Sequence, residues 1–317
     1  MSIAPPSRWI DRWNAYWFPV TPTLDLAICR VVAVVAQLLW FFPDLGEHTN
    51  LLVKNTDFIE PQLIVRAISA IVPREAFFTP EGFTVLYWAT MVAGVSALVG
   101  FFTRASLFLF ALGTWIFVAH LFSYGDRHHT EALFCIFLML LAFAPSGERL
   151  SVDALLRRRR DIAPRATSDV AIWPLKVVHV LLALTYFSAG MSKVLFSGLQ
   201  WVNGYTLQGH TFGDALQRGH PVGIWLAQQH TLAVALSYFT ILLEVFFFVS
   251  LFTPRLAPLF FLAALGFQVG LYVSAGYDFF QHMVLLVLLL LFLYPDWWRS
   301  RLGVRLNTGL PHQHSRA

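Results

Sequence analysis

Long apolar runs dominate this 317-residue chain and restrict the folds open to it. Eight segments are apolar over roughly 17–25 residues, the length that an α-helix needs to cross a bilayer. The runs are continuous and do not alternate with polar residues, as the strands of a membrane barrel would. Only 13% of the residues are charged, whereas a soluble domain carries about 25%. The sequence therefore predicts an all-α integral membrane protein, a bundle of about eight transmembrane helices. The predicted spans are 25–43, 83–102, 105–123, 130–145, 171–196, 232–252, 256–275 and 279–295.

The segments outside these runs divide the chain into three parts. An amphipathic, Trp-rich segment over 1–24 precedes a transmembrane domain over 25–305, and a tail over 306–317 is predicted to be disordered. Inside the transmembrane domain, 44–82 is predicted to be loop with one short amphipathic helix near LIVRAISAIV, and 197–231 a polar lid or re-entrant loop. We expect no cleavable signal peptide, because no small-residue cleavage site follows the first apolar run.

The arginines of the loops predict the orientation in the membrane. They gather in alternate loops and in the C-terminal tail, whereas the opposite loops are acidic or mixed. By the positive-inside rule the arginine-rich side is cytoplasmic, so both termini are predicted inside, in a bacterial inner membrane. The net charge of +4 then reflects topology and gives no reason to expect a nucleic-acid partner. The arginines of this predicted cytoplasmic side are Arg104, Arg149, Arg157, Arg158, Arg159, Arg160, Arg165, Arg255, Arg299, Arg301 and Arg305.

A single lysine, Lys193, lies at the outer boundary of the predicted fifth span. Tyr186, Gly190 and Lys193 follow the spacing i, i+4, i+7 and therefore share one face of the helix. An ionisable group at such a depth is costly, so it is a candidate for a functional role. Burial among apolar side chains disfavours a charged lysine and could yield a free amine that acts as a general base. The alternative, which position alone favours, is a lysine that extends to the outer lipid headgroups.

Other polar groups are predicted at the same outer side of the membrane. His128 and His129 stand at the mouth of the fourth span, either as partners for an anion or as a solvated pair in a loop. Tyr272, Asp278 and His282 flank the outer turn between the last two spans. We expect at least one of these three to line a common pocket with His129 and the lysine of the fifth span. No metal site is predicted, because no second ligand motif stands at helical spacing.

Two charged residues lie inside predicted spans. Glu244 is deep in the sixth span, where a lone carboxylate must be protonated or paired. It could shuttle protons, or it could hydrogen-bond a neighbouring helix. Arg30, a few residues into the first span, could extend to the cytoplasmic face or pair with Glu244.

Several motifs occur in the order found in one known family. AGMSKV followed by WVNGY resembles the AG-x-x-K-[LV]…W-V-x-G-Y segment of the vitamin K-dependent gamma-glutamyl carboxylases, whose membrane part defines the HTTM (horizontally transferred transmembrane) domain family. LDLAICRVV, RHHTEALF, ERLSVDALLRRRR and YPDWWRSRL also resemble segments of that family. The chain is therefore identified as a short bacterial member, similar over residues 20–305.

The resemblance implies a chemistry for the site. In the carboxylases the lysine of AG-x-x-K is the base that deprotonates reduced vitamin K, and a histidine is thought to stabilise the resulting anion. Lys193 and His129 fall on these two positions. O2 and CO2 are the co-substrates there, and the quinone ends as an epoxide. The residues expected to bind quinone or substrate are His128, Tyr186, Trp201, Tyr205, Gln268, Tyr272 and His282.

Departures from the family weaken the match to a full carboxylase. Gln268 stands where the carboxylases have a histidine, and His128 replaces an asparagine. The large extramembrane region that binds the propeptide in the animal enzyme has no counterpart in this sequence, so we do not expect a propeptide-directed carboxylase.

Two functional hypotheses follow. The favoured one is oxidation of a reduced quinone, of the vitamin K or menaquinone type, with a lysine base and coupled to carboxylation or another modification of a substrate such as a secreted peptide. The active pocket would open toward the outer side. The alternative is a non-catalytic membrane module that binds quinone or assists peptide maturation or export. A transporter is less favoured, because no inverted repeat is visible.

Overall fold

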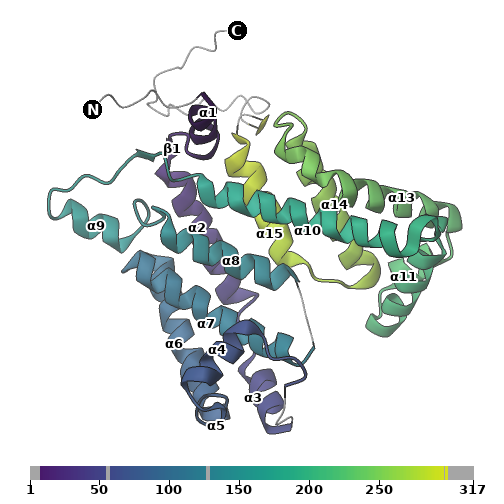
Figure 1. Cartoon of the computed structure of the whole chain (residues 1–317), viewed down its shortest axis with the longest axis horizontal. Helices are drawn as coiled ribbons and strands as arrows, with labels where there is room; N and C mark the ends of the chain where they lie inside the picture. The colour runs from purple at the N-terminus through teal and green to yellow at the C-terminus, as the bar shows by residue number, and fades with distance from the viewer. Residues whose placement is uncertain (1–7, 55–57, 126–128, 296, 299–317) are drawn as a thin grey trace.

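The computed structural model describes residues 8–54, 58–125, 129–295 and 297–298. The predicted disordered tail over 306–317 and His128 lie outside the described residues, as does the side chain of His129. Each of the eight apolar segments coincides with a helix (Figure 1), because a helix satisfies its own backbone hydrogen bonds where no water is available. These helices are α2 (Thr23–Leu39), α6 (Pro80–Val99), α7 (Thr103–Ser123), α8 (His129–Phe143), α10 (Trp173–Ser197), α13 (His230–Phe246) with η2 (Phe247–Leu251), α14 (Ala257–Ala275), and α15 (Phe280–Leu288) with η3 (Leu289–Leu293).

Five of these helices are long and apolar enough to cross a membrane, namely α6, α7, α10, α13 with η2, and α14. Helix α8 and α15 with η3 are apolar but shorter, and α2 has 17 residues. Over the described residues the chain is therefore an all-α, multi-pass membrane protein. The number of eight crossings and the cytoplasmic position of both termini stay predictions.

The connections contain more helix than the sequence predicted. The short amphipathic helix expected near LIVRAISAIV is confirmed as α4 (Leu63–Ile71), but two further helices flank it. The prediction of a loop over 197–231 was wrong, since this segment is also helical. Its glycines and polar residues lower the helix propensity only modestly, and the packing of α11 against α12, α13 and α14 outweighs that. The additional elements are α1 (Arg8–Trp17), α3 (Leu45–Lys54), α5 (Arg74–Phe77), α9 (Val152–Arg158), η1 (Gly198–Asn203), α11 (Tyr205–Arg218), α12 (Pro221–Ala227), and the paired strands β1 (Thr21–Pro22) and β2 (Thr167–Ser168).

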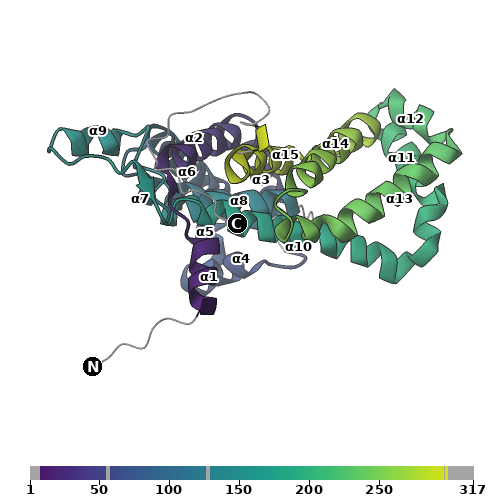
Figure 2. The same cartoon turned by 90° about the horizontal axis from the view of Figure 1, so that it is seen from above.

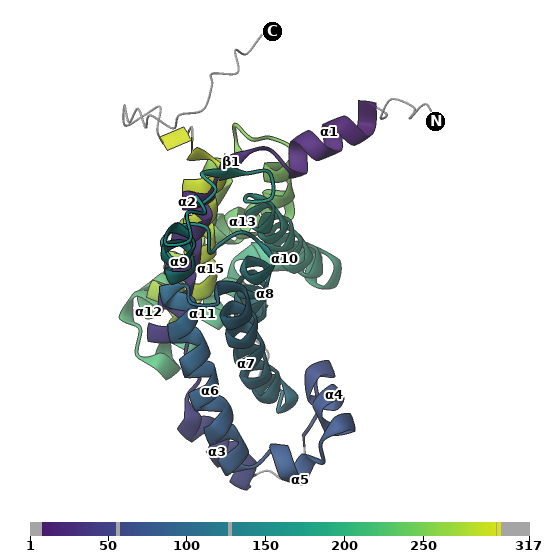
Figure 3. The ribbon, with the colours of Figure 1, turned by 90° about the vertical axis from the view of Figure 1, so that its left-hand side faces the viewer.

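The helices form two arms that meet at a central group (Figure 1). The first arm contains α3 to α7, the second arm contains α10 to α14, and α2, α8 and α15 lie between them. Figure 2 shows α11 and α12 at the far end of the second arm, where they contact α13 and α14. Figure 3 shows α3, α4 and α5 near the far ends of α6 and α7. One cluster of buried apolar side chains from α2, α6, α7, α8, α10, α13, α14 and α15 joins the two arms.

Three of the connections predicted to be cytoplasmic contact one another. Strand β1 precedes α2 and pairs antiparallel with β2, which lies between α9 and α10. The carboxylate of Asp153 in α9 accepts hydrogen bonds from the backbone N–H groups of Phe102 and Thr103 at 3.0 and 2.7 Å. The connections that precede α2, join α6 to α7 and join α8 to α10 therefore lie together, as the arginine distribution predicts.

Helix α9 packs tightly against the end of α6. Gly100 ends α6 with φ +70°, and a Cβ at this position would lie 2.3 Å from both Arg30 Nη1 and the Ser151 Cβ. A glycine is needed here for its backbone conformation and for the close approach. The guanidinium of Arg30 donates to the carbonyl oxygen of Leu150. The hypothesis that Arg30 pairs with Glu244 is therefore wrong, because Arg30 binds the connection before α9 instead.

Candidate functional site

A close approach of α10 and α13 places Lys193 on Glu244. Gly190 faces α13, and a Cβ at this position would lie 2.8 Å from the backbone nitrogen of Val245. Lys193 follows on the same face of α10, and its Nζ lies 2.8 and 2.6 Å from Oε1 and Oε2 of Glu244. This contact confirms that Glu244 bonds a neighbouring helix, and it directs Lys193 inward rather than toward the surface.

The ion pair is largely removed from solvent. The side chain of Glu244 is 6% exposed and that of Lys193 is 23% exposed. The ring of Trp201 lies on the other side of the ammonium, with its centroid 5.2 Å from Nζ, within the range of a cation–π contact. A buried carboxylate and ammonium at this distance stabilise each other's charged forms, and removing either would leave the other buried and unpaired.

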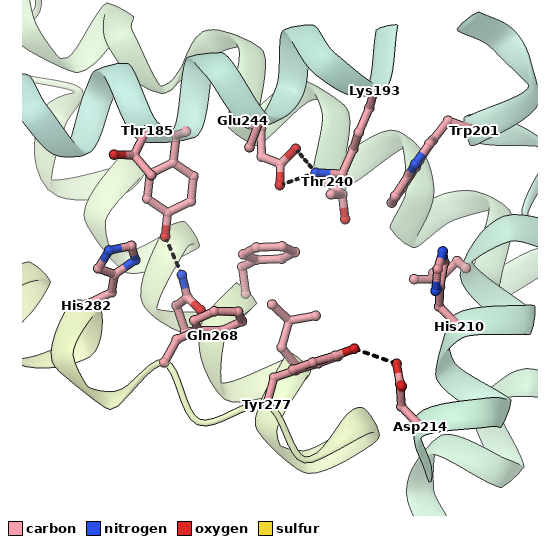
Figure 4. Close-up of a pocket in the computed structure, with 16 residues that line it drawn as sticks. Thr185, Lys193, Trp201, His210, Asp214, Thr240, Glu244, Gln268, Tyr277 and His282 are labelled. Atoms are coloured by element: carbon pink, nitrogen blue, oxygen red, sulfur yellow. Dashed lines mark hydrogen bonds and ion pairs between the residues drawn. The ribbon is translucent and has the colours of Figure 1, made fainter. Parts of the chain in front are cut away.

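The ion pair lies at the wall of a cavity of about 280 Å³ between α10, α11, α13, α14 and α15 (Figure 4). Most of the wall is apolar or aromatic, and the polar groups stand at separate points around it. In Figure 4, Lys193 and Glu244 face Tyr277 and Asp214 across the cavity, while Gln268 and His282 face Trp201 and His210. The lining residues are Thr185, Tyr186, Ala189, Lys193, Trp201, Leu207, His210, Asp214, Thr240, Glu244, Phe267, Gln268, Leu271, Tyr277, Phe279 and His282.

One wall of the cavity carries a buried hydrogen bond between α10 and α14. Gln268 Nε2 donates to the hydroxyl oxygen of Tyr186 at 2.8 Å, and the ring of Tyr186 stacks on Phe247 with centroids 4.5 Å apart. Gln268 is 4% exposed, yet its Oε1 has no hydrogen-bond partner among the described residues. Gln268 therefore carries an unsatisfied acceptor that is enclosed in this wall, while the hydroxyl hydrogen of Tyr186 is not used by the hydrogen bond to Gln268.

A second polar contact ties α11 to the turn between α14 and α15. The hydroxyl of Tyr277 donates to Oδ2 of Asp214 at 2.8 Å. Burial, the hydrogen bond to Asp214 and the charge of that carboxylate raise the pKa of Tyr277, so the phenol stays protonated. The guanidinium of Arg218 lies 4.6 Å from the centroid of the Tyr277 ring and donates to the carbonyl oxygen of Gly276. Helix α11 is thereby held against the cavity that it helps to line.

The structure brings together most, but not all, of the residues singled out from the sequence. The predicted residues that line the cavity are Lys193, Tyr186, Trp201, Gln268 and His282.

Two of the predicted binding residues lie elsewhere. Tyr205 is 68% exposed and its ring lies against that of His230, with centroids 4.6 Å apart. Tyr272 lies against the ring of Phe280 instead of lining this cavity. The predicted roles of His128 and His129 fall outside the described residues and side chains.

Asp278 lines a second cavity of about 360 Å³ instead of the first. The turn into α15 separates the two, because Tyr277 and Phe279 face the first cavity while Asp278 and Phe280 face the second. Helix α8, which begins at His129, contributes Glu131 and Cys135 to the second cavity. Tyr272, Asp278 and His282 were the outer residues of which at least one was expected to share a pocket with Lys193. Among the residues that the structure describes, His282 lines the same cavity as Lys193, and the other two do not.

Sequence reasoning missed the residues that α11 contributes to the cavity. His210 and Asp214 are one turn apart on that helix and both line the cavity. The i, i+4 spacing of His210 and Asp214 was the available signal. It indicates a shared face only in a helix, and this segment was expected to be a loop. Within the described part of the chain, no group of three His, Cys, Asp or Glu side chains is arranged to hold a metal ion.

Comparisons with known proteins agree with the resemblance noted in the motifs. Residues 22–297 match the family model of the HTTM domain, which is related to the membrane domain of vitamin K-dependent carboxylase. No curated protein and no solved structure matches the chain. Because the family match extends over nearly the whole sequence, this chain belongs to the HTTM domain family.

Proposed function

We propose that this protein oxidises a reduced quinone of the vitamin K or menaquinone type, and that Lys193 and Glu244 together accept the hydroxyl proton. The observation that carries the proposal is the Lys193 ammonium, held by both oxygens of Glu244 at the wall of an aromatic cavity. Membership of the HTTM family supports it, because the lysine of AGMSKV falls on the base of the carboxylases.

The residues of the cavity fit the ring of such a quinol. Trp201, Phe267 and Phe279 offer aromatic surfaces against which a flat ring can pack. Gln268 lines the cavity, and its unpaired Oε1 would turn toward a ring hydroxyl and accept a hydrogen bond from it. A volume of about 280 Å³ lies near the lower end of the range for small-molecule sites, ~300–1,000 Å³. We therefore place the ring inside and the isoprenoid tail outside, among the lipids.

The ion pair changes how the base would work. In the proposed mechanism Lys193 is protonated at rest and has no free electron pair, so it does not act as an independent amine. Instead, Lys193 would pass a proton to Glu244 and take the hydroxyl proton in its place. Glu244 would end neutral, and Lys193 would stay charged beside the oxygen that lost its proton. The cavity keeps one ion pair throughout, and the ammonium stabilises the new negative charge.

The remaining chemistry follows the carboxylases by analogy. With O2 as the oxidant, one quinol and one O2 yield one quinone epoxide and one water. Coupling to CO2 and to a peptide substrate, and the predicted role of His129 as stabiliser of the anion, are further parts of the proposal. Among the described residues, His282 and the Tyr186–Gln268 pair stand on the wall where a second ring oxygen would be bound.

The test is an assay on purified protein in detergent, with reduced vitamin K or menaquinone and O2. Quinol loss and epoxide formation are followed by mass spectrometry. We expect turnover by the wild type and a fall of roughly 10²–10⁴-fold in Lys193→Ala, the usual contribution of acid–base catalysis.

Lys176→Ala is the matched control, since Lys176 lies on the same helix but its ammonium packs on the ring of Tyr16, away from the cavity. Full activity in Lys193→Ala would refute the proposal. Quinone binding without any turnover by the wild type would instead favour the non-catalytic binding module.

A further inference from the structure

A groove of about 430 Å³ lies on the arginine-rich side of the molecule, away from the quinol cavity. We call it the α9 groove. Its walls come from the start of α2, the end of α6, and the segment that leads into and forms α9. The residues that matter for its chemistry are Leu24, Val99, Arg149, Leu155 and Arg158.

Two arginines of the α9 groove have no acidic partner among the described residues. Arg149 Nε is buried and makes no hydrogen bond there. Arg158 is exposed on the last turn of α9. No described carboxylate therefore neutralises the charge of either guanidinium group.

One acid, Glu148, lines the groove itself, and a second, Asp153, lies on α9; both are already engaged. Glu148 accepts from Arg157 Nη1 at 3.1 Å and from the backbone N–H of Arg165 at 3.2 Å. Asp153 accepts from the backbone and hydroxyl groups at the start of α7. These carboxylates cannot also neutralise Arg149 and Arg158 without losing those contacts.

The opposite part of the groove is apolar and reaches the surface. Leu24 is 44% exposed, Val99 is 48% exposed and Leu155 is 59% exposed. Leu24 and Val99 belong to apolar helices of a membrane protein, so we expect their exposed surfaces to contact lipid tails. The groove thus connects a lipid-contacting apolar wall with two cationic side chains.

We propose that the α9 groove binds one anionic phospholipid, with its phosphate between Arg149 and Arg158 and an acyl chain against Leu24 and Val99. Arginine suits this role because its planar fork donates two hydrogen bonds to one phosphate. Basic pockets at the membrane boundary of helical proteins recognise lipid headgroups in this way. The exposed leucines of α9, Leu155 and Leu156, next to its arginines also match a segment that rests at the membrane interface.

The rival explanation is a diffuse attraction between the arginine-rich side and any anionic surface. Arg159 and Arg160 provide the control that separates the two, because they are exposed neighbours of Arg158 and do not line the groove. Arg149→Gln/Arg158→Gln and Arg159→Gln/Arg160→Gln remove the same charge. Diffuse attraction predicts equal effects, whereas a specific site predicts a loss only in the first pair.

The experiment is native mass spectrometry of the full chain titrated with phosphatidylglycerol or with phosphatidylcholine of the same acyl chains. We expect the wild type to bind one phosphatidylglycerol in preference to phosphatidylcholine. Arg149→Gln/Arg158→Gln should lose about tenfold or more in that affinity, as the loss of a hydrogen bond to a charged group implies. Arg159→Gln/Arg160→Gln should keep it, and free inorganic phosphate should not compete at equal concentration.

Equal retention of the two lipids by the wild type, or equal losses in the two double variants, would overturn the proposal. If Arg149→Gln/Arg158→Gln does not fold, Arg158→Gln alone serves, because its side chain is exposed and its loss should still weaken phosphatidylglycerol binding relative to Arg159→Gln. Equal binding by these two single variants would likewise overturn it. None of these readouts depends on quinol turnover.

Discussion

Each arm of the molecule contains a buried polar pair between two of its helices, and the two pairs differ in charge and in the cavity beside them. In the second arm, Lys193 and Glu244 form a charged pair that borders a cavity. In the first arm, Nδ1 of His48 lies 2.9 Å from Nδ1 of His120, and these residues are 1% and 0% exposed. Aromatic rings, including that of Phe83, pack around the histidines.

Under the proposed function, the comparison separates a pair that transfers a proton from a pair that joins two helices. The Lys193–Glu244 pair is ionic and lines the cavity proposed for the quinol, so it could exchange a proton with that ligand. The imidazole pair joins α3 to α7, and its His48 lines the second cavity. Burial lowers the pKa of His48 to about 4, so this imidazole is neutral at physiological pH. We therefore expect changes to the Lys193–Glu244 pair to affect both stability and function, and changes to the histidine pair to affect stability alone.

Breaking the ion pair should produce the largest loss of stability. Lys193→Met leaves Glu244 buried without its partner, which typically costs about 3–5 kcal/mol. The double variant Lys193→Met/Glu244→Leu should recover most of the lost stability, because an apolar pair of similar volume can replace a buried ion pair. Thermal unfolding in one detergent measures both. If the double variant is no more stable than Lys193→Met, the loss of stability does not come from an unpaired Glu244 carboxylate.

Removing the unsatisfied amide oxygen of Gln268 from the wall of the quinol cavity should weaken ligand binding. Gln268→Leu deletes the Oε1 that has no partner and should raise the KM for quinol by roughly tenfold, the equivalent of one hydrogen bond. Gln281→Leu is the control, because Gln281 lines the second cavity. Steady-state kinetics measure the KM for quinol of both variants. If Gln268→Leu and Gln281→Leu have equal KM values, the ligand does not bind at Gln268.

Substitution in the histidine pair should cost less and leave catalysis intact. His48→Phe fills the space but leaves His120 Nδ1 without its partner, which costs about 1–3 kcal/mol. The Tm should fall while the quinol oxidation rate per folded molecule stays unchanged. A rate loss comparable with that of Lys193→Ala would break the distinction between the two pairs.

The smallest expected effect is a pH dependence of stability from His48. The unfolded imidazole titrates near pH 6.5 and the folded one at about 4, so the unfolded state binds more protons between these values. Stability is therefore full above pH 6.5 and declines as the pH falls toward 4. Between pH 8 and 6 the loss from this group is about 1 kcal/mol. Wild type should lose more Tm than His48→Phe over this interval; parallel curves would argue against a buried neutral imidazole.

The sequence predicted the helices of the spans well because each apolar run is a local signal. In lipid a segment must satisfy its own backbone groups, so apolarity and length suffice to predict a helix there. Helix α11 was missed because its stability depends on contacts with α12, α13 and α14, which a local pattern does not reveal.

The sequence identified some single residues of the site, but it did not predict which of them contact each other. Lys193 and Glu244 each stood out, since an ionisable group in an apolar run is costly. Their contact depends on which helices are neighbours and on the small Gly190 between them, and one sequence does not specify either. The same applies to Tyr277 and Asp214, which come from segments 63 residues apart.

The most direct test of the central claim is the quinol oxidation rate of Glu244→Gln, compared with wild type at saturating quinol and O2. The amide keeps the shape and a hydrogen bond to Lys193 but is too weak a base to take up the proton. The account predicts a loss of kcat of at least ~10²-fold with the KM for quinol little changed. A variant that keeps the wild-type kcat would contradict the paired mechanism and leave Lys193 as the base without Glu244.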